Sequence, residues 1–194
     1  MYNKAVIFLL ILIFTVSSCN TINEIKFQAN SDAEIKDATM LPFNYIKKLI
    51  VVKAQPNNAK KQNNFIFDTG AFQSKVEYNL SEDLKLATIA KRNNGTAQGI
   101  KREIEITSLD SIKLSKSKFY NIAAGKLTYD QKSYSPCIAE DGIIGANLIK
   151  LAHWKIDFKK TQILVSEKPI PSSSNNKKYD IDFCCGGGIS LSKA

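Results

Sequence analysis

The amino-acid sequence predicts an all-β domain with one short helix near its C-terminal end. From Pro42 onward, short apolar runs alternate with turn-rich gaps about every 8 to 15 residues, which is typical of many short strands. The expected strands cover residues 45–54, 64–67, 104–114, 119–127, 153–158 and 162–166. Only Ala146–Leu151, which opens just after Gly145, has the pattern of a helix, whereas Ser81–Leu86 is expected to form a turn.

The composition is that of a globular domain and argues against several other classes. The chain has 194 residues, of which 44% are hydrophobic and 23% charged, so collagen-like, low-complexity and largely disordered chains are excluded. This length suffices to form a core without metal or disulfide crosslinks. With a single histidine, His153, and four cysteines, a zinc site with several ligands is not expected. The sequence therefore predicts no metal and no cofactor.

The chain is basic, with 27 Lys and Arg against 18 Asp and Glu and a formal net charge of +9. Such a charge favours contact with anionic membranes or acidic substrates. We find no basic stripe interleaved with aromatic residues and no nucleic-acid-binding motif. We therefore expect a mostly solvated basic surface and no nucleic-acid partner.

The first residues have the features of an export signal. Lys4 precedes the apolar run Ala5–Phe14, which is too short to span a membrane. The following Val16-Ser17-Ser18-Cys19 resembles the lipobox of bacterial lipoproteins. The resemblance implies cleavage before Cys19 and lipidation of that cysteine, and hence a protein anchored in the bacterial cell envelope that faces the periplasm or the exterior. A plain secreted protein is the alternative.

These features divide the chain into four parts. Residues 1–18 are expected to be a signal peptide, 19–41 a polar tether and 42–167 the folded domain. From Lys168 the chain is rich in Pro, Ser and Asn, and an apolar stretch follows it to Ala194. We interpret 168–194 as a linker and the start of a second lobe that this chain lacks.

The most informative segment is the apolar strand Asn64–Phe67 and the residues that follow it, Asp68, Thr69, Gly70 and Ala71. Asp, Thr and Gly are common in turns, so Asp68 could simply begin one. However, an apolar strand that delivers a carboxylate into a tight turn is a costly place for a charge unless the charge is used.

With Phe65-Ile66-Phe67-Asp68-Thr69-Gly70-Ala71, the sequence resembles the retropepsin-like aspartyl proteases. A second segment, Asp141–Ile149, resembles the family's second element, in which Gly142, Ile143, Ile144 and Gly145 pass behind the catalytic loop and lead into a short helix. His153–Phe158 and 162–165 resemble the strands that close the family's domain. The resemblance covers about 45–167 and implies a small closed β-barrel.

The resemblance also implies a mechanism. Two aspartates share one proton, the ionised carboxylate activates a water, and the protonated one donates to the scissile carbonyl. Asp68 would be one of the pair, with Thr69, Gly70 and Ala71 as loop support. Thr69 would hydrogen-bond to the partner loop, and a flap would lie at 93–99 with Gly95, Thr96 and Gly99. The implied protein is a membrane-anchored aspartic endopeptidase that cleaves exported polypeptides.

Two departures from the family pattern bear on this prediction. Phe72 stands where the family usually has a small or polar residue. The chain also contains only one Asp-Thr-Gly, and half a dyad hydrolyses nothing. Either two copies pair, each contributing Asp68, or a second lobe supplies the other aspartate. The alternative function is a non-catalytic lipoprotein that binds peptide or an envelope partner.

The remaining reactive residues are expected to be structural. No nucleophile motif accompanies His153, and Trp154 is expected in the core or at its rim. A disulfide between Cys137 and either Cys184 or Cys185 is allowed in an exported protein and is left open.

Overall fold

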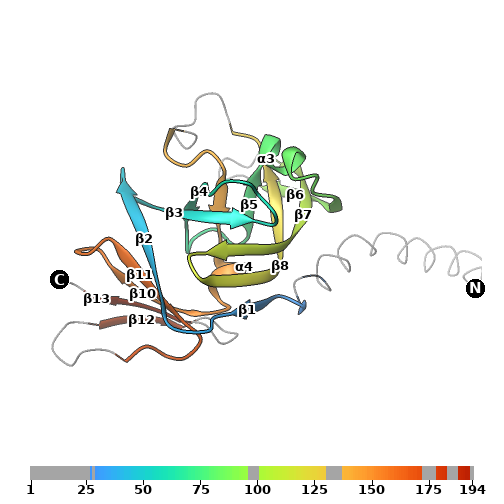
Figure 1. Cartoon of the computed structure of the whole chain (residues 1–194). Helices are drawn as coiled ribbons and strands as arrows, with labels where there is room; N and C mark the ends of the chain where they lie inside the picture. Colours follow the sequence, from blue (N-terminus) through green and yellow to red (C-terminus); the bar gives the residue numbers. More distant parts are fainter. Residues whose placement is uncertain are drawn as a thin grey trace, which may run out of the picture.

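Thirteen strands and two short helices make up the fold in the computed structural model, which describes residues 27, 29–95, 101–129, 137–171, 178–182 and 188–192 (Figure 1). The strands are β1 (Asp32–Glu34), β2 (Thr39–Ile46), β3 (Leu49–Pro56), β4 (Asn63–Phe67), β5 (Ser74–Glu77), β6 (Thr88–Gly95), β7 (Lys101–Leu114), β8 (Ser117–Leu127), β9 (Gly142–Ile144), β10 (His153–Asp157), β11 (Gln162–Ser166), β12 (Lys178–Asp182) and β13 (Gly188–Ser192). The helices are α3 (Tyr78–Asp83) and α4 (Ala146–Ile149).

Six of the strands close into a barrel. Their order is β3-β4-β9-β5-β8-β7, and β7 pairs back with β3. The β4–β9 and β5–β8 pairs are parallel, and the other four pairs are antiparallel. The prediction of an all-β domain built on a small closed barrel is therefore confirmed.

The barrel closes through a short seam between β3 and β7. Only Gln55 opposite Lys113 and Pro56 opposite Ile112 are paired there. Because proline has no N–H to donate, the ladder would end at Pro56. Asn57 extends it: its N–H donates to the Ser111 carbonyl at 2.7 Å, and its Oδ1 accepts from the Ser111 N–H at 3.2 Å.

A second sheet extends from the barrel through β2, in the order β2-β11-β10-β13-β12 (Figure 1). Trp154 of β10 joins this sheet to the barrel core. Its ring is fully buried, stacks on Phe119 at 5.7 Å between centroids and lies 5.1 Å from the ring of Phe67. The indole N–H donates to the Ile149 carbonyl at 2.6 Å, so the polar end of this large side chain is satisfied. The expectation that Trp154 belongs to the core is confirmed.

The structure differs from the sequence-based expectations at several elements. Residues expected to form the tether include β1 and the first part of β2, and Ile35 and Leu41 are buried in the core. The segment 168–194 contributes β12 and β13, and β13 pairs in parallel with β10. A second helix, α3, occupies the first half of the expected turn, and the Glu77 carboxylate caps its first turn through the Leu80 N–H.

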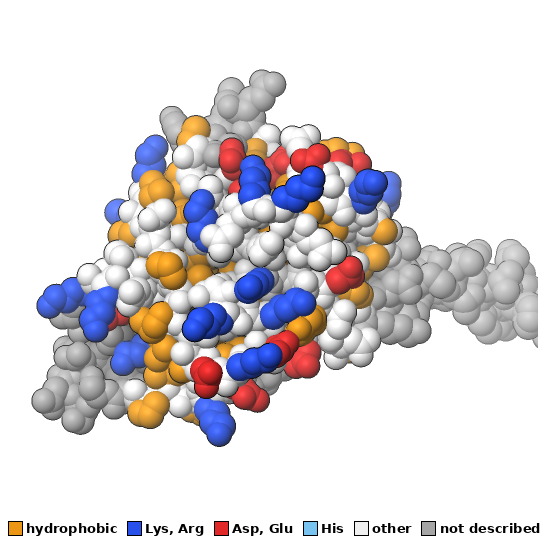
Figure 2. Space-filling model, viewed as in Figure 1, with side chains coloured by type: hydrophobic (Ala, Val, Ile, Leu, Met, Phe, Trp, Pro, Cys, Tyr) orange, Lys and Arg blue, Asp and Glu red, His pale blue; other side chains and the backbone are white. Residues whose placement is uncertain are grey.

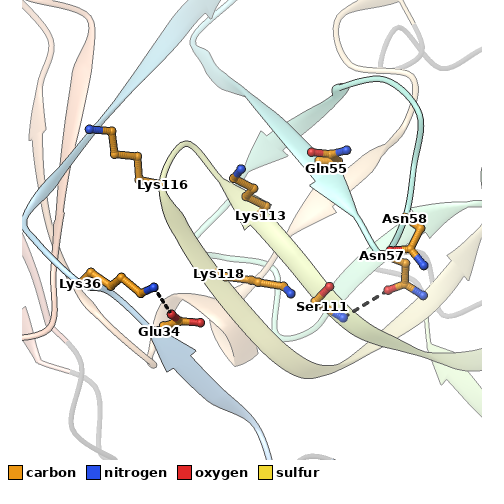
Figure 3. Close-up of a pocket in the computed structure, with 9 residues that line it drawn as sticks. All are labelled: Glu34, Lys36, Gln55, Asn57, Asn58, Ser111, Lys113, Lys116 and Lys118. Carbon is orange, nitrogen blue, oxygen red and sulfur yellow. Dashed lines mark hydrogen bonds and ion pairs between the residues drawn. The ribbon is translucent and has the colours of Figure 1, made fainter.

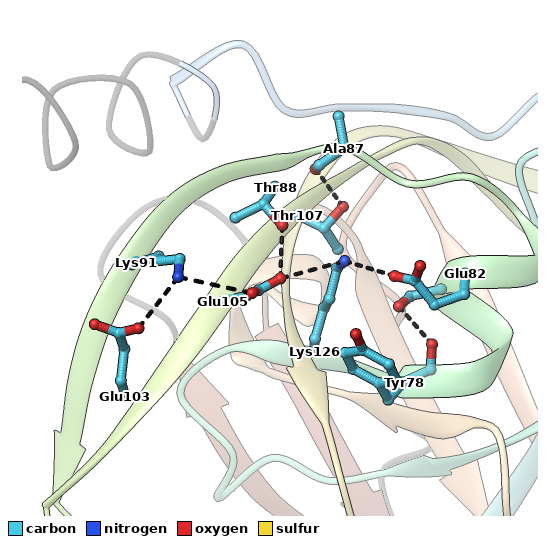
Figure 4. A network of polar contacts seen from close by, with 10 residues as sticks. Tyr78, Glu82, Ala87, Thr88, Lys91, Glu103, Glu105, Thr107 and Lys126 are labelled. Atoms are coloured by element: carbon cyan, nitrogen blue, oxygen red, sulfur yellow. Dashed lines mark hydrogen bonds and ion pairs between the residues drawn. The ribbon is translucent and has the colours of Figure 1, made fainter.

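A polar network fixes the base of the β6–β7 hairpin to the barrel (Figure 4). Lys126 of β8, whose side chain is 7% exposed, bonds Glu82 of α3 at 3.0 Å and Glu105 of β7 at 3.3 Å. Burial alone would lower the pKa of Lys126, but the bonds to Glu82 and Glu105 outweigh it and raise this pKa. Bonds from Thr88 and then Lys126 lower the pKa of Glu105. The ionised network ties α3, β7 and β8 together.

None of the helices in the described ranges has the length and hydropathy needed to cross a membrane.

Candidate active site

The loop that follows β4 places Asp68 at the end of a buried barrel strand. Phe65, Ile66 and Phe67 are all buried, whereas Asp68 is half-buried and Thr69 and Gly70 are exposed. The Asp68 N–H donates to the Ile144 carbonyl at 3.0 Å, which fixes the start of the loop on β9. The Asp68 residue is therefore accessible to molecules in the solvent, and its backbone is anchored to the core.

The loop turns tightly around the Asp68 carboxylate. Its Oδ1 accepts the Gly70 N–H at 2.8 Å, and its backbone carbonyl accepts the Ala71 N–H at 3.3 Å. The Gly70 hydrogen bond fixes the orientation of the Asp68 carboxylate relative to the loop backbone. A side chain at Gly70 would bring a Cβ to 3.2 Å from the same Oδ1, so glycine keeps the bond unobstructed.

Strand β9 passes between β4 and β5 and holds the loop from behind. Ile144 lies opposite Phe67 in the parallel β4–β9 pair, and β5 borders β9 on its other side. A Cβ at Gly142, where φ is +154°, would lie 2.2 Å from the Lys75 carbonyl oxygen. A Cβ at Gly145 would lie 2.6 Å from the Gln73 carbonyl carbon and 2.8 Å from the Ala71 oxygen. The backbones are therefore too close for any residue but glycine at both positions.

A buried polar network locks β9 and α4 onto the loop. Asn147 Oδ1 accepts the Ser74 N–H at 2.7 Å and the Ser74 hydroxyl at 2.9 Å, and Asn147 Nδ2 donates to the Ala123 carbonyl at 2.8 Å. Ser74 Oγ in turn accepts the Gly145 N–H at 3.0 Å. The Ala146 N–H also donates to the Ala71 carbonyl at 2.7 Å. These satisfied buried groups specify a single loop conformation.

Asp141, which precedes β9, has a structural role in this arrangement. Its two carboxylate oxygens accept from Asn63 Nδ2 at 3.0 Å and from the Asn64 N–H at 2.6 Å, so they hold β9 against β4. Nearby, burial raises the pKa of Tyr129 to about 12, with added shifts from the Glu77 and Asp141 carboxylates. The phenol therefore stays protonated and donates to the Ala139 carbonyl at 3.0 Å.

The β6–β7 hairpin, the expected flap, is linked to the loop at its base. Arg92 of β6 donates from Nη2 to Oε1 of the buried Gln73 at 2.6 Å. The strands pair up to Gly95 opposite Lys101, and Gly95 ends β6. Thr96 and Gly99 lie outside the described residues. The expectation that 93–99 forms a flap thus stays a prediction, although its two flanking strands form a hairpin.

Two side chains of the loop, Thr69 and Phe72, are exposed. Phe72 is 75% exposed, and the Thr69 hydroxyl makes no hydrogen bond within the described part of the chain. Thr69 and Phe72 lie one and four residues after Asp68 in the same loop. Because both are exposed, a second protein or a ligand can reach them without first breaking contacts of the loop.

The other candidate residues lie elsewhere. His153 begins β10 and is half-buried, and Cys137 is exposed and unpaired in the part of the chain that the structure describes. Cys19, Cys184 and Cys185 lie outside the described residues. No group of three potential metal ligands occurs within the described ranges.

Sequence reasoning assigned no role to Asn147, Gln73 or Arg92, although all three support the loop. The sequence signal that indicates a role for Asn147 is its position, an amide side chain directly after the Gly145-Ala146 pair. Arg92 and Gln73 offered no comparable signal, because their contact depends on how a distant hairpin packs.

Comparison with known proteins gave a structural likeness. No protein-family model and no curated protein sequence matches the chain. Among solved structures, the chain is similar to the crystal structure of a retropepsin-like aspartic protease from Rickettsia conorii, with 21% sequence identity and a TM-score of 0.49. The match covers 71% of this chain and 94% of that one.

The close approach at Gly145 predicts a large effect of a small substitution. We expect Gly145→Ala to lower the free energy of unfolding by about 1–3 kcal/mol, because the added methyl must displace backbone atoms of the loop. Gly125→Ala is the matched control, since the nearest atom to its Cβ is a side-chain carbon at 3.7 Å. Urea unfolding measures both variants, and equal stability of the two would contradict the predicted clash.

Proposed function

We propose that the protein is an aspartic endopeptidase and that Asp68 is its catalytic carboxylate. The observation that carries the proposal is the Asp68 loop: a half-buried carboxylate bonded by the Gly70 N–H and fixed from behind by β9. Such rigid placement is what catalysis by a positioned acid or base requires. The Asp-Thr-Gly-Ala sequence of this loop, together with Gly142–Gly145, supports the assignment.

The reaction needs a second carboxylate, which we propose comes from Asp68 of a second copy of this chain. The unpaired Thr69 hydroxyl and the exposed Phe72 beside it support this arrangement. In a twofold pair, each Thr69 hydroxyl would bond the other loop, and each Phe72 would leave water. A second lobe with its own aspartate is the other arrangement that the chemistry allows.

The two carboxylates would divide the work through one shared proton. Like charges a few Å apart do not both ionise, so the pair titrates as a unit with one proton over an intermediate pH range. The ionised member takes a proton from water, and the water oxygen attacks the peptide carbonyl carbon. The protonated member gives its proton to the carbonyl oxygen. As the tetrahedral intermediate collapses, the carboxyl that took the water proton delivers it to the leaving nitrogen and the C–N bond breaks. A hydroxyl proton of the intermediate returns to the other carboxylate, which restores the singly protonated pair.

We propose an extended polypeptide as the substrate. It would lie between the Asp68 loop and the β6–β7 hairpin and would be held by strand-like main-chain hydrogen bonds. The Arg92–Gln73 bond supports this proposal because it couples the base of the hairpin to the loop. Closure of the hairpin over a peptide would then bear directly on the backbone that carries Asp68.

We further propose that a lipid on Cys19 anchors the protein in the bacterial cell envelope, where its substrates are exported polypeptides. The Val16-Ser17-Ser18-Cys19 sequence supports this anchor. Several acyl chains hold a protein on a membrane without a spanning helix.

A second candidate function is peptide binding without cleavage. The bulky, exposed Phe72 beside the loop favours it, because an aromatic side chain there offers an anchor for an apolar ligand.

The peptidase assignment predicts complete dependence on the Asp68 carboxylate. Asp68→Asn should lower peptide-bond cleavage at least about a thousandfold, since the amide is not a base. Asp83→Asn, on the exposed end of α3, should leave it unchanged. The assay follows cleavage of an unfolded protein mixture by mass spectrometry from acid to neutral pH. Peptide binding without cleavage by the unaltered chain would instead favour the binding function.

If two copies share one site, an inactive copy should lower the cleavage activity of the unaltered chain. About three equivalents of Asp68→Asn chain, equilibrated with one of unaltered chain, should lower cleavage to roughly a quarter, because random pairing leaves about one unaltered chain in four with an unaltered partner. Cleavage is measured at fixed concentration of the unaltered chain. Activity that does not change on mixing would show that each chain forms its site alone.

The proposed anchor predicts that membrane association depends on Cys19. In a bacterial host, Cys19→Ser should move the protein from the membrane fraction to the soluble fraction, because the acylated atom is lost. Cys137→Ser, which changes an exposed cysteine of the folded domain, should leave it in the membrane fraction. Fractionation of membranes washed at high salt, which removes protein held only by charge, followed by immunoblotting checks both variants. Cys19→Ser protein that stays on the membrane after this wash would contradict the proposal.

A further inference from the structure

A basic pocket of about 510 Å³ lies on the outer surface of the barrel and is not part of the Asp68 loop (Figure 3). We call it the lysine pocket. Its lining has four lysines and one glutamate together with neutral polar side chains: Lys36, Lys113, Lys116, Lys118, Glu34, Gln55, Asn57, Asn58 and Ser111. In Figure 2, basic side chains gather over the barrel in the middle of this face, with acidic side chains along their lower edge.

Strand register places three of the pocket's five charged residues in one row. Gln55 of β3 lies opposite Lys113 of β7, Lys113 lies opposite Lys118 of β8, and Lys118 lies opposite Glu34 of β1. Opposed residues on antiparallel strands point to the same face, so the two lysine side chains are direct neighbours. Like charges in directly opposite positions destabilise a sheet. Glu34, which lies opposite Lys118, offsets part of this repulsion, and a bound anion would offset more of it.

Little in the described part of the chain neutralises these lysines. Glu34 is already engaged, with Lys36 at 3.2 Å and with the Tyr120 hydroxyl at 2.7 Å, and the Tyr120 bond is the largest cause of its lowered pKa. Lys118 lies 4.8 Å from the centre of the Tyr120 ring, and Lys113 and Lys116 form no ion pair with described residues. The pocket thus has a net positive charge and unused donors.

The neutral residues add directed donors at the same place. Asn57 uses its Oδ1 to accept the Ser111 N–H, which leaves its Nδ2 as a donor beside Lys113. Ammonium groups combined with amide donors suit a compact, multiply charged oxyanion such as a phosphate.

We propose that the lysine pocket binds the phosphate head groups of an anionic membrane and so orients the protein on it. Charge complementarity supports this ligand, and the chain supports its location. Glu34 is the last residue of β1, the first strand described after the proposed lipid anchor, and Lys36 lies in the loop that follows β1. The segment from Cys19 to Asp32 reaches at most about 45 Å even when fully extended, so an anchored barrel stays near the membrane surface. The placement of the lysine pocket near a membrane rests on the lipid anchor at Cys19 proposed above.

The test uses the unlipidated chain from Asn20 to Ala194, which contains every strand and core residue described here. Its binding to vesicles of phosphatidylglycerol and phosphatidylcholine is measured by sedimentation, with phosphatidylcholine vesicles as a reference. We expect binding to the anionic vesicles only. The Lys113→Gln/Lys118→Gln double variant should bind about 25-fold more weakly, since one lysine at such a surface contributes about fivefold. Lys159→Gln/Lys160→Gln removes the same charge from the β10–β11 turn and should change binding less than about twofold.

The outcomes separate the proposal from its alternatives. Equal losses in the two double variants would show general attraction of a basic protein and would overturn the pocket assignment. Amide NMR shifts of Asn57 and Ser111 on titration with inorganic phosphate, without vesicle binding, would assign the pocket to a soluble phosphate and overturn the membrane ligand. Because the assay uses neither lipidation nor a peptide substrate, its failure is distinguishable from failure of the anchor or of the peptidase.

Discussion

The close passage of β9 between β4 and β5 is the constraint on which the rest of the structure depends. It joins β4 to β5 in the six-stranded barrel, and it brings the Ile144 carbonyl to the Asp68 N–H and the Ala146 N–H to the Ala71 carbonyl. Only glycine at 142 and 145 permits this approach. The continuity of the barrel wall and the geometry of the loop are therefore consequences of the same backbone contact, and neither is expected to vary without the other.

Support for the Asp68 loop comes in successive layers, each from a distant part of the chain. The Ser74–Asn147 network holds the loop to α4, and Trp154 of the second sheet packs on Phe67, the residue just before Asp68. Arg92 adds a contact from the β6–β7 hairpin. The half-buried Asp68 carboxylate is thus placed by buried side chains, in the way that rigid scaffolds position groups carried on loops.

The features that the sequence predicted are those encoded locally. The strand before Asp68, the strand β9 that begins at Gly142 and the helix after Gly145 all follow from short patterns, and the structure has each of them. The capped helix α3 was expected as a turn, although its Glu77 cap is local. The short strands β1 and β5 escaped prediction because their stability depends on partners tens of residues away. For the same reason the sequence does not predict the lysine pocket, because Lys113, Lys118 and Gln55 become neighbours only through strand register.

The seam between β3 and β7 has a consequence for motion within the barrel. Two residue pairs join these strands and Pro56 withholds one donor, although Asn57 adds two hydrogen bonds beside them, so the seam is one of the two short pairings in the barrel, the other being β5–β9. Separation there would loosen β3, which is paired along its other edge with β4, the strand that ends at Asp68. An anion that contacts both Asn57 and Lys113 would act as a clamp across the seam. An anion bound in the lysine pocket would then reduce the motion of β3 and β4 and so of the loop that carries Asp68.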